Sequence, residues 1–263
     1  MINKSRLLHS VLPLFALCLL ALPLAACSGL HIVVGTGDII SKSYDFKDFN
    51  QIEISSALQY EISQAQDFSV AVSAHQNIFT YMDVSQSGST LVVRMKPGSF
   101  TNTSAKATIT LPQMEGLSVS GASKGSAKGF NQTAGLKIEV SGASQLDLDA
   151  TAAASELTIS GASRVTGHLD AQNARFGISG ASRCQLEGST GPTDLNVSGA
   201  SRFDCSNLIL KSANANVSGA SHAAVNTSGV LNLEVTGASS LDYYGTPTLG
   251  KAVVNGASQI NKK

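Results

Sequence analysis

Apolar and polar residues alternate in short runs through most of this chain. Before each copy of the sequence Ser-Gly-Ala-Ser, apolar residues stand one and three places upstream with a polar or small residue between them, as in Leu157-Thr158-Ile159. A second alternation places apolar residues five and seven places after the first serine, as at Leu146 and Leu148. A period of two is typical of a β-strand with one buried face. Each repeat therefore predicts two short strands joined at a corner.

The tetrapeptide that marks these corners recurs at a nearly constant spacing. Six copies begin at residues 120, 141, 160, 179, 198 and 218, and variants that begin with Thr and Asn start at residues 236 and 255. A period near twenty residues is typical of a solenoid, whose repeats bury their apolar faces only against one another. A helical crossover needs about thirty residues, more than one repeat provides. We therefore predict an all-β fold, a right-handed parallel β-helix of about 19-residue coils over residues 120–263.

Each residue of the tetrapeptide has an expected role at the corner. Glycine supplies unusual backbone angles, alanine fits where a larger side chain would clash with the next coil, and serine can hydrogen-bond along the stack. The motif is then a requirement of the fold. The alternative is that it also forms a recognised surface.

The repeat is not visible before residue 120, although strand signals continue. Runs such as "QIEIS" from Gln51 and "TLVVRM" from Thr90 alternate, and Gly88 marks a turn. We interpret residues 45–119 as an irregular β section that starts the same stack and closes its N-terminal end. No helix is predicted.

The beginning of the chain predicts a membrane anchor. Two basic residues, Lys4 and Arg6, precede an apolar stretch that ends in "LAAC" at Cys27. This ending resembles the bacterial lipobox, which implies cleavage before Cys27 and acylation of that residue. We expect a lipoprotein signal peptide at 1–26, a lipidated tether at 27–44 and, since Ser28 is not Asp, an outer-membrane location in the bacterial cell envelope. A transmembrane helix is the rival interpretation.

Charge and composition exclude some partners. Removal of residues 1–26 takes away two basic residues and no acid, which leaves 16 basic and 18 acidic residues. Such a balance gives no reason to expect nucleic acid as a partner. Trp is absent, so the chain also lacks the aromatic platforms that many sugar-binding grooves use.

Several segments together resemble a known family. The opening "DFKDFNQIEIS", the strand ending "STLVVRM", the junction "ITLPQMEGLSVSGAS" and the tandem repeats are similar to the head GIN domain family of autotransporter adhesins over about residues 45–260. The resemblance implies a β-helical fold on a bacterial envelope lipoprotein. It brings no catalytic residues.

One outward column carries candidate chemistry. The residue after each tetrapeptide reads Lys124, Gln145, Arg164, Arg183, Arg202, His222, Ser240 and Gln259. Three arginines thus stand on consecutive coils, about 4.8 Å apart. The column is either a solvated face, with Asp204 screening Arg202, or a ladder that receives an anionic polymer such as an acidic glycan.

Two classes of function remain. Parallel β-helices also carry polysaccharide lyases and hydrolases, which need clustered carboxylates. The outward acids here are spread over several coils: Asp147, Asp149, Asp204 and Asp242. The histidines lack paired ligand spacing, so neither a metal nor a cofactor is expected. We predict a non-catalytic, adhesin-like module that binds an anionic glycan or an envelope protein; the alternative is a carbohydrate-active enzyme.

The remaining cysteines and the end of the repeats give two further expectations. Cys184 and Cys205 fall on inward positions of adjacent coils with a two-residue offset, which separates their Cα atoms by roughly 8 Å. We therefore predict free thiols.

Lys262 and Lys263 follow the last coil and discourage edge pairing, which favours a monomer.

Overall fold

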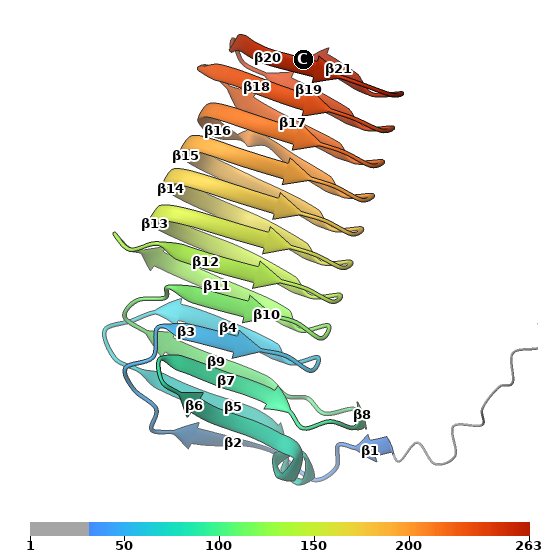
Figure 1. Cartoon of the computed structure of the whole chain (residues 1–263). Helices are drawn as coiled ribbons and strands as arrows, with labels where there is room; N and C mark the ends of the chain where they lie inside the picture. Colours follow the sequence, from blue (N-terminus) through green and yellow to red (C-terminus); the bar gives the residue numbers. More distant parts are fainter. Residues whose placement is uncertain (1–31) are drawn as a thin grey trace, which may run out of the picture. The chain divides into compact units, whose positions relative to one another are not determined.

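The strands of the repeat region form two flat layers that face each other (Figure 1), and the chain joins them at the far bend into one continuous sheet; we call the layers sheet 1 and sheet 2. The computed structural model describes residues 32–263, so Cys27 and the signal peptide expected at 1–26 lie outside the described residues. Sheet 1 holds the strand that precedes each tetrapeptide, and sheet 2 holds the strand that follows it. Phe176 of sheet 1 and Phe203 of sheet 2 meet across the interior with ring centroids 5.2 Å apart. The core is therefore the narrow space between the two sheets.

The regular coils contain twelve strands. Three precede the long ones: β10 (Gly116–Val119), β11 (Lys124–Asn131) and β12 (Leu136–Val140). Four long strands run through sheet 2, around the far bend and into sheet 1 of the next coil: β13 (Gln145–Ile159), β14 (Arg164–Ile178), β15 (Arg183–Val197) and β16 (Arg202–Val217). Five complete the stack: β17 (His222–Thr227), β18 (Val230–Val235), β19 (Ser240–Tyr244), β20 (Thr248–Val254) and β21 (Gln259–Lys262).

Parallel pairing aligns each residue with its counterpart one coil further on. Val165 of β14 pairs with Cys184, and Cys184 pairs with Phe203. All three side chains are buried, as the period of two predicted. The predicted parallel β-helix of about 19-residue coils is confirmed.

Glycine is the residue of the tetrapeptide that tolerates no replacement on steric grounds. All eight corner glycines have φ between +62° and +79°. A Cβ atom on Gly180 would lie 2.4 Å from the carbonyl oxygen of Gly161 in the preceding coil. The next residue, Ala181, donates its N–H to that same oxygen at 2.7 Å. Backbone contact between successive corners therefore requires glycine.

At the corner, the structure contradicts the role expected for alanine and supports the role expected for serine. The corner alanines are exposed, so the expected clash of a larger side chain with the next coil is wrong: their methyl groups point to solvent. The second serine of each regular corner is buried, apart from that of the last coil. Ser201 Oγ lies 3.3 Å from the carbonyl oxygen of Gly180 and Ser221 Oγ lies 3.3 Å from that of Gly199, as expected for a bond along the stack.

Two coils of the N-terminal section join the stack out of sequence order. They consist of β3 (Gln51–Ile54) with β4 (Gln59–Gln64), and β7 (Thr90–Met95) with β9 (Lys106–Leu111). β3 pairs with both β7 and β10, and β4 pairs with both β9 and β11. The first coil in the sequence is therefore the second one in space.

Mostly antiparallel strands, with one short helix and one small parallel pair, close this end of the molecule, and we call these elements the cap. The cap consists of β2 (Ile39–Tyr44), β5 (Ser69–His75), the 3-10 helix η1 (Gln76–Tyr81), β6 (Met82–Ser87) and the small pair β1 (Ile32–Val34) with β8 (Ser99–Thr101). β5 pairs with β9 and β2, and β6 pairs with β7, all antiparallel. The expectation of a tether up to residue 44 is wrong from Ile32 onward, because β1 and β2 are hydrogen-bonded parts of the fold. The short helix η1 was not expected either.

The cysteines of the interior are free. Cys184 pairs in register with Phe203, so Cys205 stands two residues further along the neighbouring strand, as predicted. Burial raises the pKa of the Cys205 thiol, and contact with Cys184 raises it further.

The corner geometry makes a specific prediction. Gly180→Ala should lower the stability by about 1–3 kcal/mol, because it forces a side chain into a positive φ and against a backbone oxygen. Ala181→Ser, one residue away and exposed, should change it by less than about 0.5 kcal/mol. Urea unfolding followed by circular dichroism compares the two, and equal midpoints would contradict this account of the corner.

Candidate functional site

The three arginines stand at the first positions of three adjacent strands of sheet 2. Arg164 pairs in register with Arg183, and Arg183 with Arg202. All three are exposed, and the column continues to Gln145 on one side and His222 on the other. We call Arg164, Arg183 and Arg202 the arginine ladder.

The arginine ladder is only partly neutralised. Arg202 lies 3.7 Å from a carboxylate oxygen of Asp204, two residues along its own strand. Within residues 32–263, neither Arg164 nor Arg183 has a carboxylate oxygen within the 4.0 Å of an ion pair. Like charges directly opposite one another destabilise neighbouring strands. Two of the three guanidinium groups are thus left without an opposite charge.

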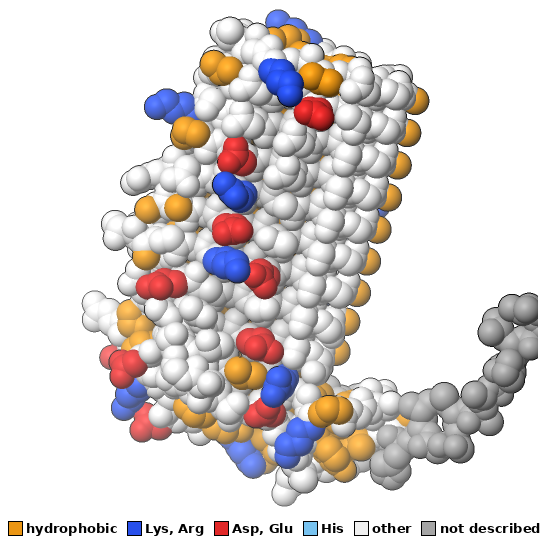
Figure 2. Space-filling model, viewed as in Figure 1, with side chains coloured by type: hydrophobic (Ala, Val, Ile, Leu, Met, Phe, Trp, Pro, Cys, Tyr) orange, Lys and Arg blue, Asp and Glu red, His pale blue; other side chains and the backbone are white. Residues whose placement is uncertain are grey.

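Sheet 1 pairs its charges differently. One of its columns reads Lys137, Glu156, Arg175 and Asp194 on successive coils, so that each charge faces the opposite sign. Arg175 lies 3.5 Å from Asp194. Figure 2 shows basic and acidic side chains alternating along this face. The same chain therefore carries a neutralised column on one face and a column of a single sign on the other.

A groove runs beside the arginine ladder. Its volume is about 350 Å³, and the ladder lines one side of it while Thr166, Gln185 and Asp204 line the other. These three polar residues form the next outward column, with Thr166 opposite Gln185 and Gln185 opposite Asp204. Guanidinium groups and hydrogen-bonding side chains thus face one elongated hollow.

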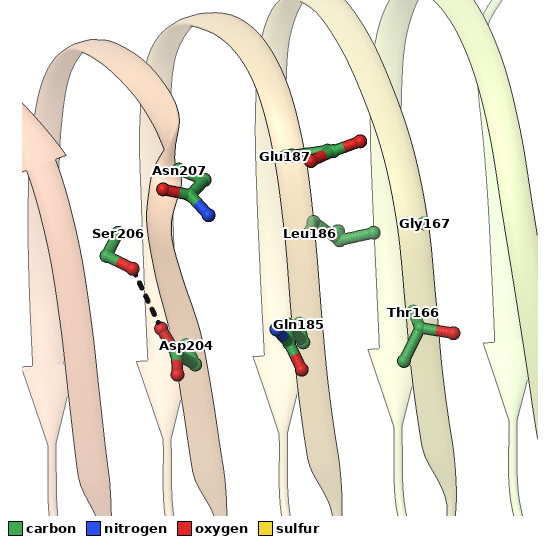
Figure 3. A pocket seen from close by; sticks show the side chains of 8 residues that line it. All are labelled: Thr166, Gly167, Gln185, Leu186, Glu187, Asp204, Ser206 and Asn207. Carbon is green, nitrogen blue, oxygen red and sulfur yellow. Dashed lines mark hydrogen bonds between the residues drawn. The ribbon is translucent and has the colours of Figure 1, made fainter.

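A second hollow continues the groove toward the far bend (Figure 3). It shares the polar column and adds Glu187, Ser206 and Asn207. Gly167 stands in register between the buried residues Leu148 and Leu186, has φ +129° and lies so close to the carbonyl oxygen of Leu148 that a Cβ atom would clash with it. The strand register also shifts between Gln185 and Gly188. The sequence did not reveal this hollow, because both features interrupt the repeat.

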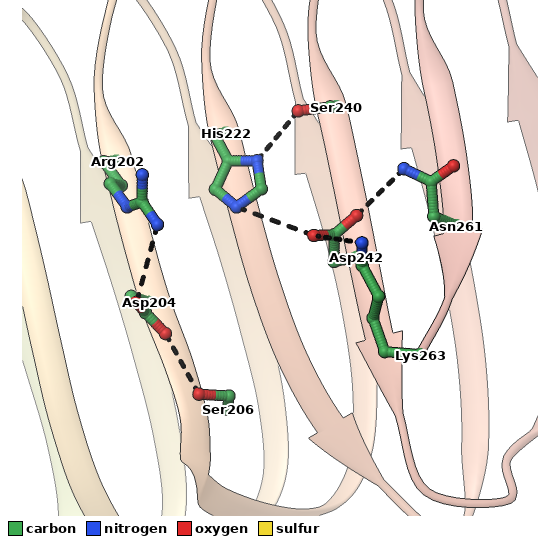
Figure 4. A network of polar contacts seen from close by, with 8 residues as sticks. All are labelled: Arg202, Asp204, Ser206, His222, Ser240, Asp242, Asn261 and Lys263. Atoms are coloured by element: carbon green, nitrogen blue, oxygen red, sulfur yellow. Dashed lines mark hydrogen bonds and ion pairs between the residues drawn. The ribbon is translucent and has the colours of Figure 1, made fainter.

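A polar network closes the C-terminal side of the arginine ladder (Figure 4). His222 Nδ1 lies 2.8 Å from Ser240 Oγ, and His222 Nε2 lies 4.0 Å from Asp242. Asp242 also accepts a hydrogen bond from Asn261 and lies 3.5 Å from the Lys263 ammonium group. A distance of 4.0 Å is too long for the hydrogen bond that orients a catalytic histidine. The network links the last coils and does not form a Ser-His-Asp triad.

Neither a metal centre nor a membrane-spanning helix is present in the described part of the chain. No group of three His, Cys, Asp or Glu side chains in residues 32–263 could hold a metal ion. Across the same residues, no helix has the length and apolar character that crossing a bilayer requires. Glu187 and Asp204 do line one hollow, but Asp204 already accepts a hydrogen bond from Ser206 and lies beside Arg202.

Comparison with known proteins decides the family. Residues 48–247 match the family described as "Putative auto-transporter adhesin, head GIN domain". The chain belongs to this head GIN domain family. A search of curated proteins found no match.

Solved structures share the fold of this head GIN domain. A "putative adhesin" from Parabacteroides distasonis superposes with a TM-score of 0.81 at 19% identity, over 88% of this chain and 99% of that one. A "putative lipid binding protein" from the same species gives 0.82 at 16% identity, again over 88% and 99%. A "putative adhesin" from Parabacteroides merdae gives 0.81 at 16%, with the same coverage. At these identities the likeness establishes the fold alone.

The different charge patterns of the two faces predict opposite effects on stability. Arg183→Gln removes a charge with like neighbours on both sides, so it should raise the thermal midpoint by about 1–3 °C at low salt. Arg175→Gln, the matched change on sheet 1, should lower it slightly. High salt should remove the difference because both sites are exposed. A midpoint for Arg183→Gln below that of the wild type at low salt would contradict the unpaired ladder.

Proposed function

We propose that this head GIN domain is a non-catalytic, adhesin-like module of the bacterial cell envelope that binds an anionic polysaccharide along sheet 2. The arginine ladder carries the proposal, because its charges lie in register without the neutralisation that sheet 1 provides. The family description supports an adhesin-like role.

The arginine ladder suits a polymer whose charges repeat. Two like charges one rung apart repel by roughly 1 kcal/mol in water, and a bound polyanion would replace this repulsion with attraction. Guanidinium groups also bind carboxylates through two parallel hydrogen bonds, which fixes the geometry as well as the charge. A linear chain with regularly placed carboxylates can meet all three arginines along the stack.

The polar column beside the ladder favours a sugar polymer over a simple polyanion. Thr166 offers a hydroxyl group, Gln185 an amide and Asp204 a carboxylate that can accept hydrogen bonds from sugar hydroxyl groups. The groove has no aromatic platform among its lining residues. Binding should therefore rest on charge and hydrogen bonds and should weaken strongly with salt.

The proposed module is held at the membrane by acylation of Cys27, in the outer membrane, and acts as a monomer. The lipobox-like ending "LAAC" at residues 24–27 supports the anchor, and Ser28 supports sorting to the outer membrane. The adhesin description of the family is consistent with an envelope location.

The lipid anchor makes a prediction of its own. Wild-type protein expressed in a bacterial host should enter the detergent phase and incorporate labelled fatty acid, whereas Cys27→Ser should do neither, because the acylated thiol is gone. A Cys27→Ser protein that stays with the membrane at the wild-type level would contradict the lipoprotein assignment.

Binding by the arginine ladder is tested with polygalacturonate, which carries one carboxylate per sugar. Combined Arg164→Gln, Arg183→Gln and Arg202→Gln should weaken binding by at least about tenfold in calorimetry, because three charge-assisted contacts are lost. Wild-type binding should fall with salt, and methyl-esterified polygalacturonate should bind poorly.

The matched control removes three basic charges from the other face. Combined Lys137→Gln, Arg175→Gln and Lys251→Gln changes the net charge equally but leaves the arginine ladder intact. It should bind like the wild type. If both triple variants bind equally well, the ladder is only a solvated face. The length of the polymer should be unchanged after incubation; shortened chains would support the alternative of a carbohydrate-active enzyme.

A further inference from the structure

The cap exposes aliphatic side chains at the start of the described chain. Ile32 and Val34 of β1 are 55% and 47% exposed, and Ile39 of β2 is 57% exposed. They contribute three of the seven large hydrophobic residues that are exposed in residues 32–263. Figure 2 shows hydrophobic side chains gathered at this end of the molecule. Clustered exposed apolar residues often mark an interaction surface.

Half-buried aromatic rings surround the same end. Those that pack against the core from the cap and its connections are Tyr44, Phe46, Phe68, Phe79, Tyr81 and Phe100. The ammonium group of Lys42 lies 4.5 Å from the centre of the Phe79 ring. Tyrosine and lysine side chains are favoured where a protein meets the headgroup region of a bilayer, because each has an apolar body and a polar tip, and the phenylalanine rings add apolar surface.

The position of the cap in the chain, close to Cys27, indicates that the partner of this surface is the bilayer. Cys27, the proposed site of acylation, stands five residues before Ile32. Five residues reach at most about 18 Å even when fully extended. The lipid anchor would therefore hold β1 within that distance of the bilayer, whereas the other end of the stack has no such constraint.

We propose that the cap rests on the phospholipid surface through Ile32, Val34 and Ile39. This proposal rests on the proposed lipid anchor and adds a second, non-covalent contact. Acidic residues such as Asp38 and Asp45 accompany Lys42 and Lys47, and Lys47 is already paired with Asp45 at 3.1 Å. The contact is thus apolar, and a zwitterionic bilayer suffices.

The orientation of the cap on the membrane determines how far the arginine ladder lies from the bilayer. Six successive pairings lead from β2 through β5, β9, β4, β11 and β13 to β14, which begins with Arg164. At about 4.8 Å per strand, the first arginine stands roughly 29 Å beyond the outermost cap strand. A cap that lies on the membrane would hold the groove clear of the lipid headgroups.

Fluorescence quenching by lipids with brominated acyl chains tests this orientation in the full lipidated protein. Single variants Ser41→Cys in β2 and Asn255→Cys at the other end, both exposed positions, would carry the fluorophore in phosphatidylcholine vesicles. Cys184 and Cys205 are buried and should not react. The label at residue 41 should be quenched at least severalfold more than the label at residue 255, with little change in high salt. Equal quenching at the two positions would overturn the proposal.

Two triple variants isolate the aliphatic contact. Ile32→Ser with Val34→Ser and Ile39→Ser should remove most of the quenching at residue 41, without a change in thermal midpoint because all three side chains are exposed. The matched control, Val230→Ser with Leu249→Ser and Val254→Ser, changes residues that are 46%, 47% and 46% exposed elsewhere on the stack. The control should keep full quenching. Full quenching in the cap variant would overturn the role of these residues.

Flotation of the vesicles separates the two proposals. Wild-type protein that does not float with the vesicles would overturn both the lipid anchor and the contact that rests on it. Protein that floats but shows no preferential quenching at residue 41 would leave the anchor standing and overturn only the resting cap.

Discussion

Parallel pairing without a register offset is the constraint on which the rest of the structure depends. Because most residues lie opposite their counterparts in the next coil, with register shifts at only a few points, most positions of the repeat become columns along the stack. A residue type that occurs at one position of the repeat must therefore fit beside the same residue type in the next coil. At the corner this brings the Cα of Gly180 so close to the backbone of Gly161 that no Cβ can be accommodated, and the N–H of Ala181 bonds to the same backbone. The repeated glycine of the tetrapeptide follows from that contact.

Because of the same constraint, charged side chains at one position of the repeat form columns along the surface. On sheet 1, Glu156 stands between Lys137 and Arg175, so that the stacking of columns neutralises the charges. On sheet 2, Arg183 stands between two other arginines. A surface selected only for stability has no reason to keep the second arrangement when the first is available in the same coils. The groove beside the arginine ladder supplies a place for the missing opposite charge.

The parts of the fold that repeat were predictable, and the parts that do not repeat were not. The register of Arg164, Arg183 and Arg202 follows from counting residues after each tetrapeptide. The order of the first two coils does not, because alternation reveals a strand but not its neighbour. The corner of the first coil also lacks glycine: Ser56 and Ala57 take up φ of 70° and 59° themselves. β1 and β2 were missed because edge strands bury few side chains, and the second hollow was missed because Gly167 and the register shift after Gln185 interrupt the repeat.

Protection of arginine side chains by a bound polymer tests the central claim most directly. Phenylglyoxal modifies guanidinium groups, and mass spectrometry reports the extent at each residue with and without polygalacturonate. The account predicts that Arg164, Arg183 and Arg202 become protected together, while Arg94 and Arg175, whose side chains are 49% and 66% exposed, react as before. Equal modification of all five arginines, or protection of Arg175 in place of the ladder, would contradict it.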